Sequence, residues 1–245
     1  YIVDAFTDAL FRGNPAGVCL LERELDAKTM QAIAAENNLS ETAFLLKREG
    51  AYGLRWFTPK TEIDLCGNAT LASAYVLSHF TDRGGKIWRF DTKSGLLTVE
   101  KTGDLYELDF PSRKMERIET TERMAQAIGM PVLEAYASPG DLLLLLEDEG
   151  WVRDAKPDSA LIETLAEHAV TITAKGDTAD FVSRFFAPNM GIPEDPVTGS
   201  AHPALIPFWA ERLKKTAMTA KQLSQRGGTL YCENRGIRVK IAGKA

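Results

Sequence analysis

One segment of this chain occurs twice, with the two copies 129 to 132 residues apart. The first copy covers residues 55–72 (RWFTPKTEIDLCGNATLA) and the second covers 184–204 (RFFAPNMGIPEDPVTGSAHPA). Each copy is an aromatic strand that ends in proline, an acidic loop and a Gly-small-Ala turn that opens an apolar helix. The second loop is three residues longer. The repeat predicts two similar halves, the alternative being a chance likeness between two strand-turn-helix units.

Each repeated turn sits at the start of a helix, where N–H groups have no intrahelical partner and the helix dipole leaves a partial positive charge. Two such helix starts that faced each other would form a pocket for an anion such as a carboxylate. We therefore expect the backbone at Gly67 and Asn68, together with Gly199 and Ser200, to bind a small-molecule carboxylate substrate.

Composition excludes several classes of partner. The chain has 245 residues, a formal net charge of −5 and no cluster of Lys and Arg, which argues against nucleic acid or an anionic membrane surface. No apolar run approaches the ~20 residues that span a bilayer. The chain has three cysteines, Cys19, Cys66 and Cys232, an odd number of residues that lie far apart in the sequence. This pattern does not suit a set of disulfides and favours a reducing, cytoplasmic location. We expect no metal site and no cofactor, because neither ligand spacing nor a nucleotide-binding loop is present.

Hydrophobic periodicity predicts two α+β halves. In the first half we expect strands at 1–6, 17–21, 40–46, 54–58, 87–91, 96–100 and 106–110, and a helix from about 69 to 80 that is apolar nearly all round. In the second half we expect strands at 142–146, 170–174, 181–186, 229–232 and 237–241, and helices at 122–128, 158–167 and 201–213. A helix without a polar face is a buried one. Each half therefore resembles a curved mixed sheet around one central helix, with the boundary at Pro111, giving residues 1–111 and 112–245.

Three side chains near the repeated turns could carry chemistry. Glu41 lies where a helix gives way to a strand, a position at which carboxylates are usually solvated. Asp195 is either a capping carboxylate or a group at the mouth of the anion pocket. Cys66 opens the first helix, where the dipole favours a thiolate nucleophile or proton carrier, although a buried and inert cysteine is the commoner outcome.

Several motifs together are similar to one family. Residues 4–7 (DAFT), 11–17 (FRGNPAG), 38–44 (NLSETAF), 57–59 (FTP) and 194–201 (EDPVTGSA) resemble the PhzF-like (phenazine-biosynthesis-like) proteins, in family order and across most of the chain. These proteins share the diaminopimelate epimerase fold. The resemblance implies a cofactor-independent isomerase of two pseudo-symmetric halves, with its active site in the cleft between them, and often a homodimer.

The resemblance also implies residue roles. Glu41 corresponds to the general acid/base of the family and Asp195 to the aspartate that helps to hold the substrate, with Gly199 and Ser200 donating hydrogen bonds. The family usually has His after the glycine of the first turn, where this chain has Asn68, so a proton shared between Glu41 and a histidine is not available.

A second likeness concerns Cys66. The run of Cys66, Gly67 and Asn68 is similar to diaminopimelate epimerase, which uses one thiol at each helix start. The repeat places Thr198 opposite Cys66, and a threonine hydroxyl cannot serve as a thiolate-like base near neutral pH, which argues against a two-thiol racemase.

We therefore expect an isomerase that moves a proton or double bond on a small carboxylate, with Glu41 and Asp195 as catalytic residues. Cys66, Gly67 and Asn68 would contribute to substrate binding on the first half. Two alternatives remain open: a cysteine-dependent racemase or epimerase of an amino or hydroxy acid, and a non-catalytic metabolite-binding member of the fold.

Overall fold

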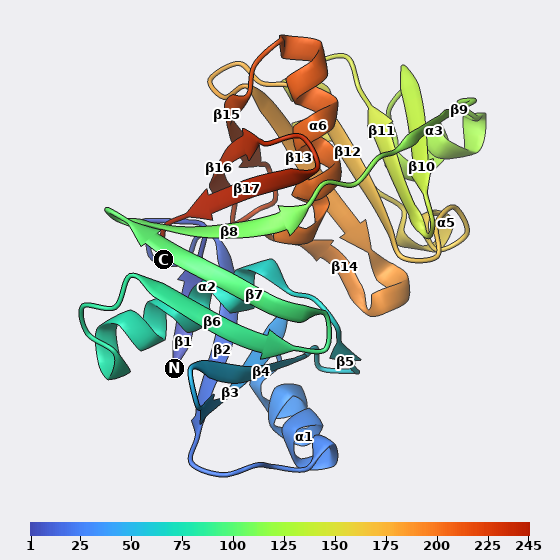
Figure 1. The fold of residues 1–245 in the computed structure, drawn as a ribbon. Helices are drawn as coiled ribbons and strands as arrows, with labels where there is room; N and C mark the ends of the chain where they lie inside the picture. Colours follow the sequence, from blue (N-terminus) through green and yellow to red (C-terminus); the bar gives the residue numbers. More distant parts are fainter. The chain divides into compact units, whose positions relative to one another are not determined.

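The computed structural model describes all residues from Tyr1 to Ala245 (Figure 1). The chain divides into two compact units. The first comprises Tyr1–Phe110 with Lys240–Ala245, and the second comprises Pro111–Val239. The last six residues therefore group with the N-terminal unit.

The first unit is a mixed sheet. β1 (Ile2–Ala5) pairs antiparallel with β2 (Asn14–Leu21), which runs parallel to β3 (Glu41–Arg48), and β3 is antiparallel to β4 (Ala51–Phe57). β4 also pairs with the short β5 (Glu62–Ile63) and runs parallel to β6 (Ile87–Thr92). The sheet continues antiparallel through β7 (Gly95–Thr102) and β8 (Leu105–Pro111).

The central helix of this unit is α2 (Gly67–Val76), which contacts β1, β2, β3 and β7. Nine of its ten residues are buried, as the apolar sequence predicts. Two buried hydroxyls in α2 are satisfied within the helix, since Thr70 Oγ1 donates to the Cys66 carbonyl (2.5 Å) and Ser73 Oγ donates to the Ala69 carbonyl (2.6 Å). The helix continues into a wider π-helical turn, η1 (Leu77–Thr81).

A second helix, α1 (Ala27–Asn37), packs on β3 and β4 through Met30 and Ala34. Asp26 caps its start by accepting a hydrogen bond from the Thr29 N–H (2.9 Å). The helix ends at Asn38 in the left-handed conformation (φ 48°), which is a common way to stop a helix. This turn leads directly into β3 and makes Glu41 its first residue.

Gly13, in the loop between β1 and β2, explains part of the sequence motif at 11–17. Its φ is +66°, and an added Cβ would lie 2.2 Å from the Ala5 carbonyl oxygen. Only glycine therefore fits this turn.

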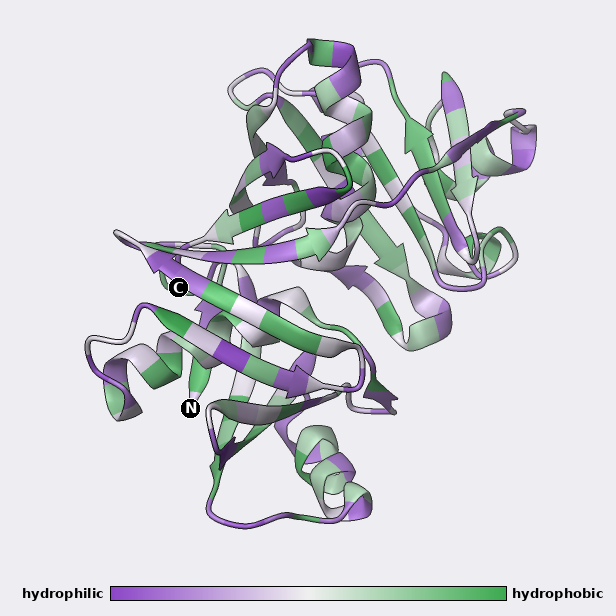
Figure 2. Cartoon of the chain, viewed as in Figure 1, coloured by the Kyte–Doolittle hydropathy of each residue, from purple (hydrophilic) through white to green (hydrophobic).

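The second unit is also a mixed sheet. β9 (Glu116–Ile118), β10 (Glu134–Ser138) and β11 (Asp141–Leu145) are antiparallel, β11 runs parallel to β12 (Ala169–Lys175), and β12 is antiparallel to β13 (Phe181–Ala187). β13 pairs with β14 (Ile192–Asp195) and runs parallel to β15 (Ala217–Gln222), which is antiparallel to β16 (Gly228–Asn234). The last strand of the chain, β17 (Arg238–Gly243), begins in this unit, and its residues from Lys240 onward group with the first unit. In Figure 2 β11 is hydrophobic along most of its length, as expected for a buried strand.

The helices of this unit are α3 (Glu122–Ile128), α4 (Glu149–Asp154), α5 (Ser159–Ile162) and α6 (His202–Leu213), with single 3-10 turns at η2 (Pro188–Met190) and η3 (Gly199–Ala201). α6 contacts β15 and β16 and follows η3 without a break. Pro207 lies inside α6 and has no N–H to give to the Pro203 carbonyl, which instead accepts a hydrogen bond from the Arg113 N–H (2.9 Å).

The two units repeat one order of elements. In chain order, the first unit has β1, β2, β3, β4, β5, α2, β6 and β7, and the second has β10, β11, β12, β13, β14, α6, β15 and β16. Each pair of neighbouring strands in the first unit is parallel or antiparallel as its counterpart in the second unit is. This correspondence confirms the prediction of two α+β halves, each with a mixed sheet and a central helix.

Some element predictions were wrong. The helix expected at 158–167 is only the short α5. After it the backbone makes tighter i→i+3 hydrogen bonds, from the Thr164 N–H to the Leu161 carbonyl (3.1 Å) and from the Leu165 N–H to the Ile162 carbonyl (2.9 Å). The short helix α4 was not predicted. None of the helices combines the length and the apolar character that a bilayer-crossing helix needs.

Candidate active site

Glu41 and Asn68 meet in the first unit. Glu41 opens β3 and Asn68 lies in the first turn of α2, and both residues are almost completely buried (6% and 4% exposed). The Asn68 amide nitrogen Nδ2 donates a hydrogen bond to Glu41 Oε2 at 2.6 Å. A hydrogen bond from an uncharged donor to a buried carboxylate stabilises its ionised form. The candidate base therefore sits at the N-terminus of the central helix.

Cys66 extends this contact by one residue. It is the N-cap of α2 and has an extended backbone, but its side chain makes no capping hydrogen bond. Its thiol Sγ instead donates to the amide oxygen of Asn68 (3.0 Å). Cys66, Asn68 and Glu41 thus form a buried thiol–amide–carboxylate chain, beside the N-terminal N–H groups of Gly67 and Asn68.

The second unit also has a buried carboxylate near the start of its central helix, contributed by a different strand. Asp195 ends β14 and is 5% exposed, and its Oδ2 accepts a hydrogen bond from the Thr198 hydroxyl (2.5 Å). Thr198 is the N-cap of η3, where Gly199 is buried and Ser200 is partly exposed, and it makes no side-chain capping bond. Asp195, Gly199 and Ser200 therefore lie at one helix start, as the repeat predicts.

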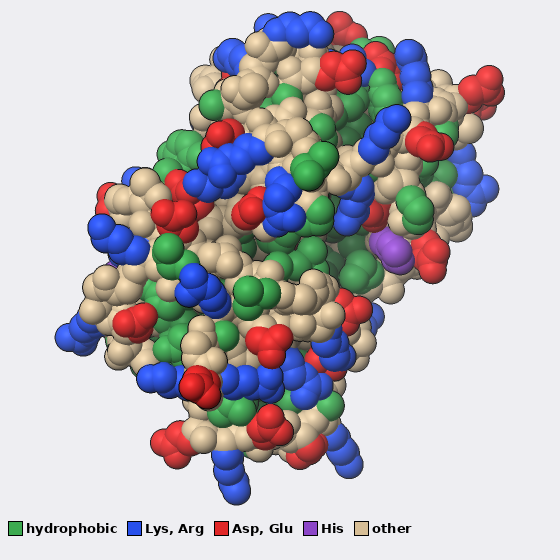
Figure 3. Space-filling view, in the orientation of Figure 1, with side chains coloured by type: hydrophobic (Ala, Val, Ile, Leu, Met, Phe, Trp, Pro, Cys, Tyr) green, Lys and Arg blue, Asp and Glu red, His purple; other side chains and the backbone are tan.

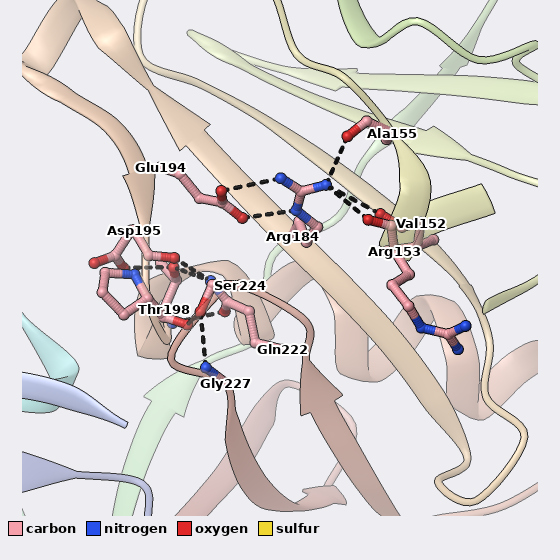
Figure 4. A network of polar contacts seen from close by, with 11 residues as sticks. Val152, Arg153, Ala155, Arg184, Glu194, Asp195, Thr198, Gln222, Ser224 and Gly227 are labelled. Carbon is pink, nitrogen blue, oxygen red and sulfur yellow. Dashed lines mark hydrogen bonds and ion pairs between the residues drawn. The ribbon is translucent and has the colours of Figure 1, made fainter. Parts of the chain in front are cut away.

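Gln222 holds this loop in place, and no sequence motif points to it. It ends β15 and is 1% exposed. Its amide nitrogen donates to the Asp195 carbonyl (2.6 Å) and to the Thr198 hydroxyl (3.1 Å), while its amide oxygen accepts from the Thr198 N–H (2.7 Å). Figure 4 shows these three residues directed toward one another. Ser224, which donates to the Pro196 carbonyl (2.7 Å), supports the same turn.

A bidentate ion pair precedes each helix start. In the first unit Arg55 binds both carboxylate oxygens of Glu62 (2.7 and 2.9 Å), and this contact holds the pKa of Glu62 below its ordinary value. In the second unit Arg184 binds Glu194 in the same way (2.7 and 3.0 Å), as Figure 4 shows. Arg184 and Glu194 occupy the repeat positions of Arg55 and Glu62, so the duplication extends to side-chain contacts.

His202 is a structural residue of the second unit. It is fully buried, and its Nδ1 hydrogen-bonds to the Thr198 carbonyl (2.8 Å), as Thr70 does to the Cys66 carbonyl in the first unit. Burial lowers the pKa of His202 to about 4, and its Nε2 has no hydrogen-bond partner. The imidazole is therefore neutral near pH 7.

Neither unit contains a group of three or more His, Cys, Asp or Glu side chains arranged to hold a metal ion. A cavity of about 790 Å³ lies between α6 and the strands β10 and β11, and Asp195, Gly199 and Ser200 do not line it. Hydrophobic side chains are visible in this hollow in Figure 3, with Lys and Arg around it.

The fold defines the class of protein. A solved structure of a probable proline racemase from Agrobacterium radiobacter has a TM-score of 0.66 to this chain, covering 99% of this chain and 89% of the other. Its sequence is only 12% identical, so this likeness shows the fold alone. The chain has the α+β fold of the diaminopimelate epimerase type.

Closer relatives identify the family. The sequence profile of the phenazine biosynthesis-like proteins matches residues 3–245. An uncharacterized isomerase of Pseudomonas aeruginosa is 49% identical over 243 residues (99% of this chain and 93% of the relative), and a human phenazine biosynthesis-like domain-containing protein is 40% identical over 273 residues (100% and 95%). The crystal structure of a PhzF family protein from Enterococcus faecalis has a TM-score of 0.96 at 48% identity, covering 100% of this chain and 94% of the other. This chain belongs to the phenazine biosynthesis-like (PhzF) family.

Proposed function

We propose that this protein is a cofactor-independent isomerase that moves a proton or a double bond on a small carboxylate such as an amino or hydroxy acid. The observation that carries the proposal is the buried Glu41 carboxylate, held by the Asn68 amide at the N-terminus of α2. Bacterial relatives at 49% and 43% identity are named isomerases, which supports the same class of reaction.

Glu41 acts as the general acid/base. Its carboxylate takes a proton from a carbon that the neighbouring carbonyl or double bond activates, and the electrons of the broken C–H bond pass into an enolate-like anion. Glu41 then delivers the proton to another carbon of the conjugated system, so that the double bond moves. This step leaves Glu41 ionised for the next cycle.

The two helix starts bind the anionic substrate in this proposal. As the family resemblance implies, we propose an active site in a cleft between the halves. There the N–H groups at Gly67 and Asn68 and at Gly199 and Ser200 bind the carboxylate and stabilise the developing charge. Asp195 accepts hydrogen bonds from a hydroxyl or ammonium group of the substrate, as an ionised acid can. The cytoplasmic location and the homodimer expected from the sequence belong to this proposal.

The second candidate is a racemase that uses Cys66 as one base. The position of Cys66 at the start of a central helix favours it, because a thiolate is stabilised there. Two observations speak for Glu41 instead. The Cys66 thiol is already engaged with Asn68, and its counterpart in the repeat is a threonine, Thr198. A non-catalytic metabolite-binding role is the third candidate.

Solvent isotope exchange tests the proposal. The protein is incubated with pools of carboxylate metabolites in heavy water, and mass spectrometry identifies any compound that gains one deuterium only when protein is present. We expect one such compound with the unaltered protein and none with Glu41→Gln. Exchange that survives in Glu41→Gln and disappears in Cys66→Ser would establish the cysteine-dependent reaction, and binding without exchange would establish the non-catalytic role.

A further inference from the structure

We propose that Cys66 and Asn68 are positioning residues for Glu41: the Cys66 thiol fixes the orientation of the Asn68 amide, and the amide fixes and stabilises the ionised Glu41 carboxylate. This inference rests on the proposed role of Glu41 as the proton acceptor. It assigns the Cys66 and Asn68 side chains to action through Glu41, while the backbone N–H groups at Gly67 and Asn68 keep their proposed contact with the substrate.

The chemistry of the three groups determines which atom donates and which accepts in each hydrogen bond. An ionised carboxylate can only accept hydrogen bonds, so the group of Asn68 that lies 2.6 Å from Glu41 Oε2 must be its NH₂. The amide oxygen then faces the thiol, which donates to it at 3.0 Å. Turning the amide over would bring two acceptors together at 2.6 Å and place the NH₂ against sulfur, a weak acceptor.

Burial makes this arrangement effective. Cys66, Asn68 and Glu41 are 3%, 4% and 6% exposed, so bulk water competes little with their hydrogen bonds. In such surroundings a hydrogen bond is electrostatically stronger than in water, and an unmatched polar group is costly. Asparagine carries no titratable proton, so Asn68 can hold Glu41 without exchanging a proton with it.

The second unit shows a parallel use of the N-cap residue. Serine, threonine, aspartate and asparagine at an N-cap usually bond to the first N–H groups of their own helix. Neither Cys66 nor Thr198 does so. Thr198 donates to the Asp195 carboxylate directly, and Cys66 reaches the Glu41 carboxylate through Asn68. In both units the N-cap side chain is directed to a carboxylate of the candidate site.

Titration of the Glu41 carboxyl group tests the inference without a substrate. The carboxyl carbons of glutamate are labelled with carbon-13, and the Glu41 signal is assigned by its loss in Glu41→Gln. We expect Asn68→Asp to move the titration midpoint to higher pH by about one unit or more, because a like charge replaces a donor. Asn68→Ala and Cys66→Ala should move it the same way by less, and Cys66→Ser should keep the unaltered midpoint because a hydroxyl also donates.

Ser73→Ala is the matched control. Ser73 is buried in α2 and donates to the Ala69 carbonyl, so the variant perturbs the same helix without touching the chain of contacts to Glu41. We expect its midpoint to equal that of the unaltered protein. An unchanged midpoint in Asn68→Asp and Asn68→Ala, or a shift in Cys66→Ser as large as that in Cys66→Ala, would overturn the inference.

The isotope-exchange assay separates this inference from the proposed function. Its pH profile should move in the same direction as the Glu41 titration in each Asn68 and Cys66 variant. If Glu41→Gln keeps full exchange while Asn68→Asp shifts the Glu41 signal, the proposed function fails and the positioning contacts stand. If Glu41→Gln is inactive while the titration midpoint of Glu41 is unchanged in both Asn68 variants, the positioning inference alone fails.

Discussion

His202 and Thr70 make equivalent hydrogen bonds in the two central helices, although only His202 can titrate. Each bonds to the carbonyl of the N-cap residue of its central helix, Thr198 and Cys66 respectively. The histidine brings a titratable ring into a fully buried position, where only its neutral form is tolerated. This difference makes the second unit sensitive to acid at a residue that takes no part in the proposed chemistry.

The sign of this pH dependence follows from the lowered pKa of His202, about 4 in the folded chain against an ordinary 6.5. Below pH 6.5 the unfolded chain binds a proton at this ring that the folded chain does not, so the free energy of unfolding falls as pH falls. The loss is complete below about pH 4 and amounts to on the order of 3 kcal/mol. Above pH 6.5 the ring contributes no pH dependence.

His202→Asn tests this prediction, because an asparagine amide can replace the Nδ1–H donor without titrating. Urea unfolding is measured between pH 7 and pH 4. We expect the unaltered protein to lose more stability over this range than His202→Asn, by on the order of 3 kcal/mol. Equal losses in the two proteins would show that the imidazole is not kept neutral by folding.

At the scale of elements, an ion pair with a strand arginine holds the loop before each central helix against its sheet. The two arginines differ in burial. The Arg184 side chain is 11% exposed and also donates to the carbonyls of Val152, Arg153 and Ala155 at 3.3, 3.3 and 2.9 Å. The Arg55 side chain is 36% exposed, and its partner Glu62 has a second cation in Lys93 at 2.7 Å.

Arg184→Met and Arg55→Met form a matched pair of variants. Removing Arg184 leaves Glu194 and three carbonyls without their donor, so we expect a loss of about 3–5 kcal/mol in the free energy of unfolding. Removing the more exposed Arg55 should cost less than about 1 kcal/mol. Urea unfolding of both variants checks this order, and equal losses would contradict it.

The elements that the sequence predicted well are those with strong patterns. The helix of residues 67–76 is apolar nearly all round and is buried, and the run of leucines in β11 is a buried strand. The short strands β5 and β14 were not predicted, because two to four residues carry no periodicity. Their place is set by pairing with β4 and β13, which depends on the folded sheet.

At the scale of the whole molecule, the repeat in the sequence was the most reliable guide. It predicted two similar halves, and the order and direction of strand pairing agree in both. The family motifs indicated Glu41 and Asp195 as candidate site residues. The repeat indicated the two helix starts beside them. Gln222 could not be predicted, because a single glutamine at the end of a strand has no sequence pattern, and its role depends on contacts with residues 24 to 27 positions away.

Our central proposal is that the two carboxylates have different roles: Glu41 transfers the proton and Asp195 binds the substrate. Steady-state kinetics of Glu41→Gln and Asp195→Asn, with the compound identified by isotope exchange, test it most directly. We predict that Glu41→Gln lowers kcat by about 10²–10⁴-fold while binding persists, whereas Asp195→Asn weakens binding together with rate. Normal substrate binding and complete loss of proton exchange in Asp195→Asn, with Glu41→Gln still active, would contradict the account.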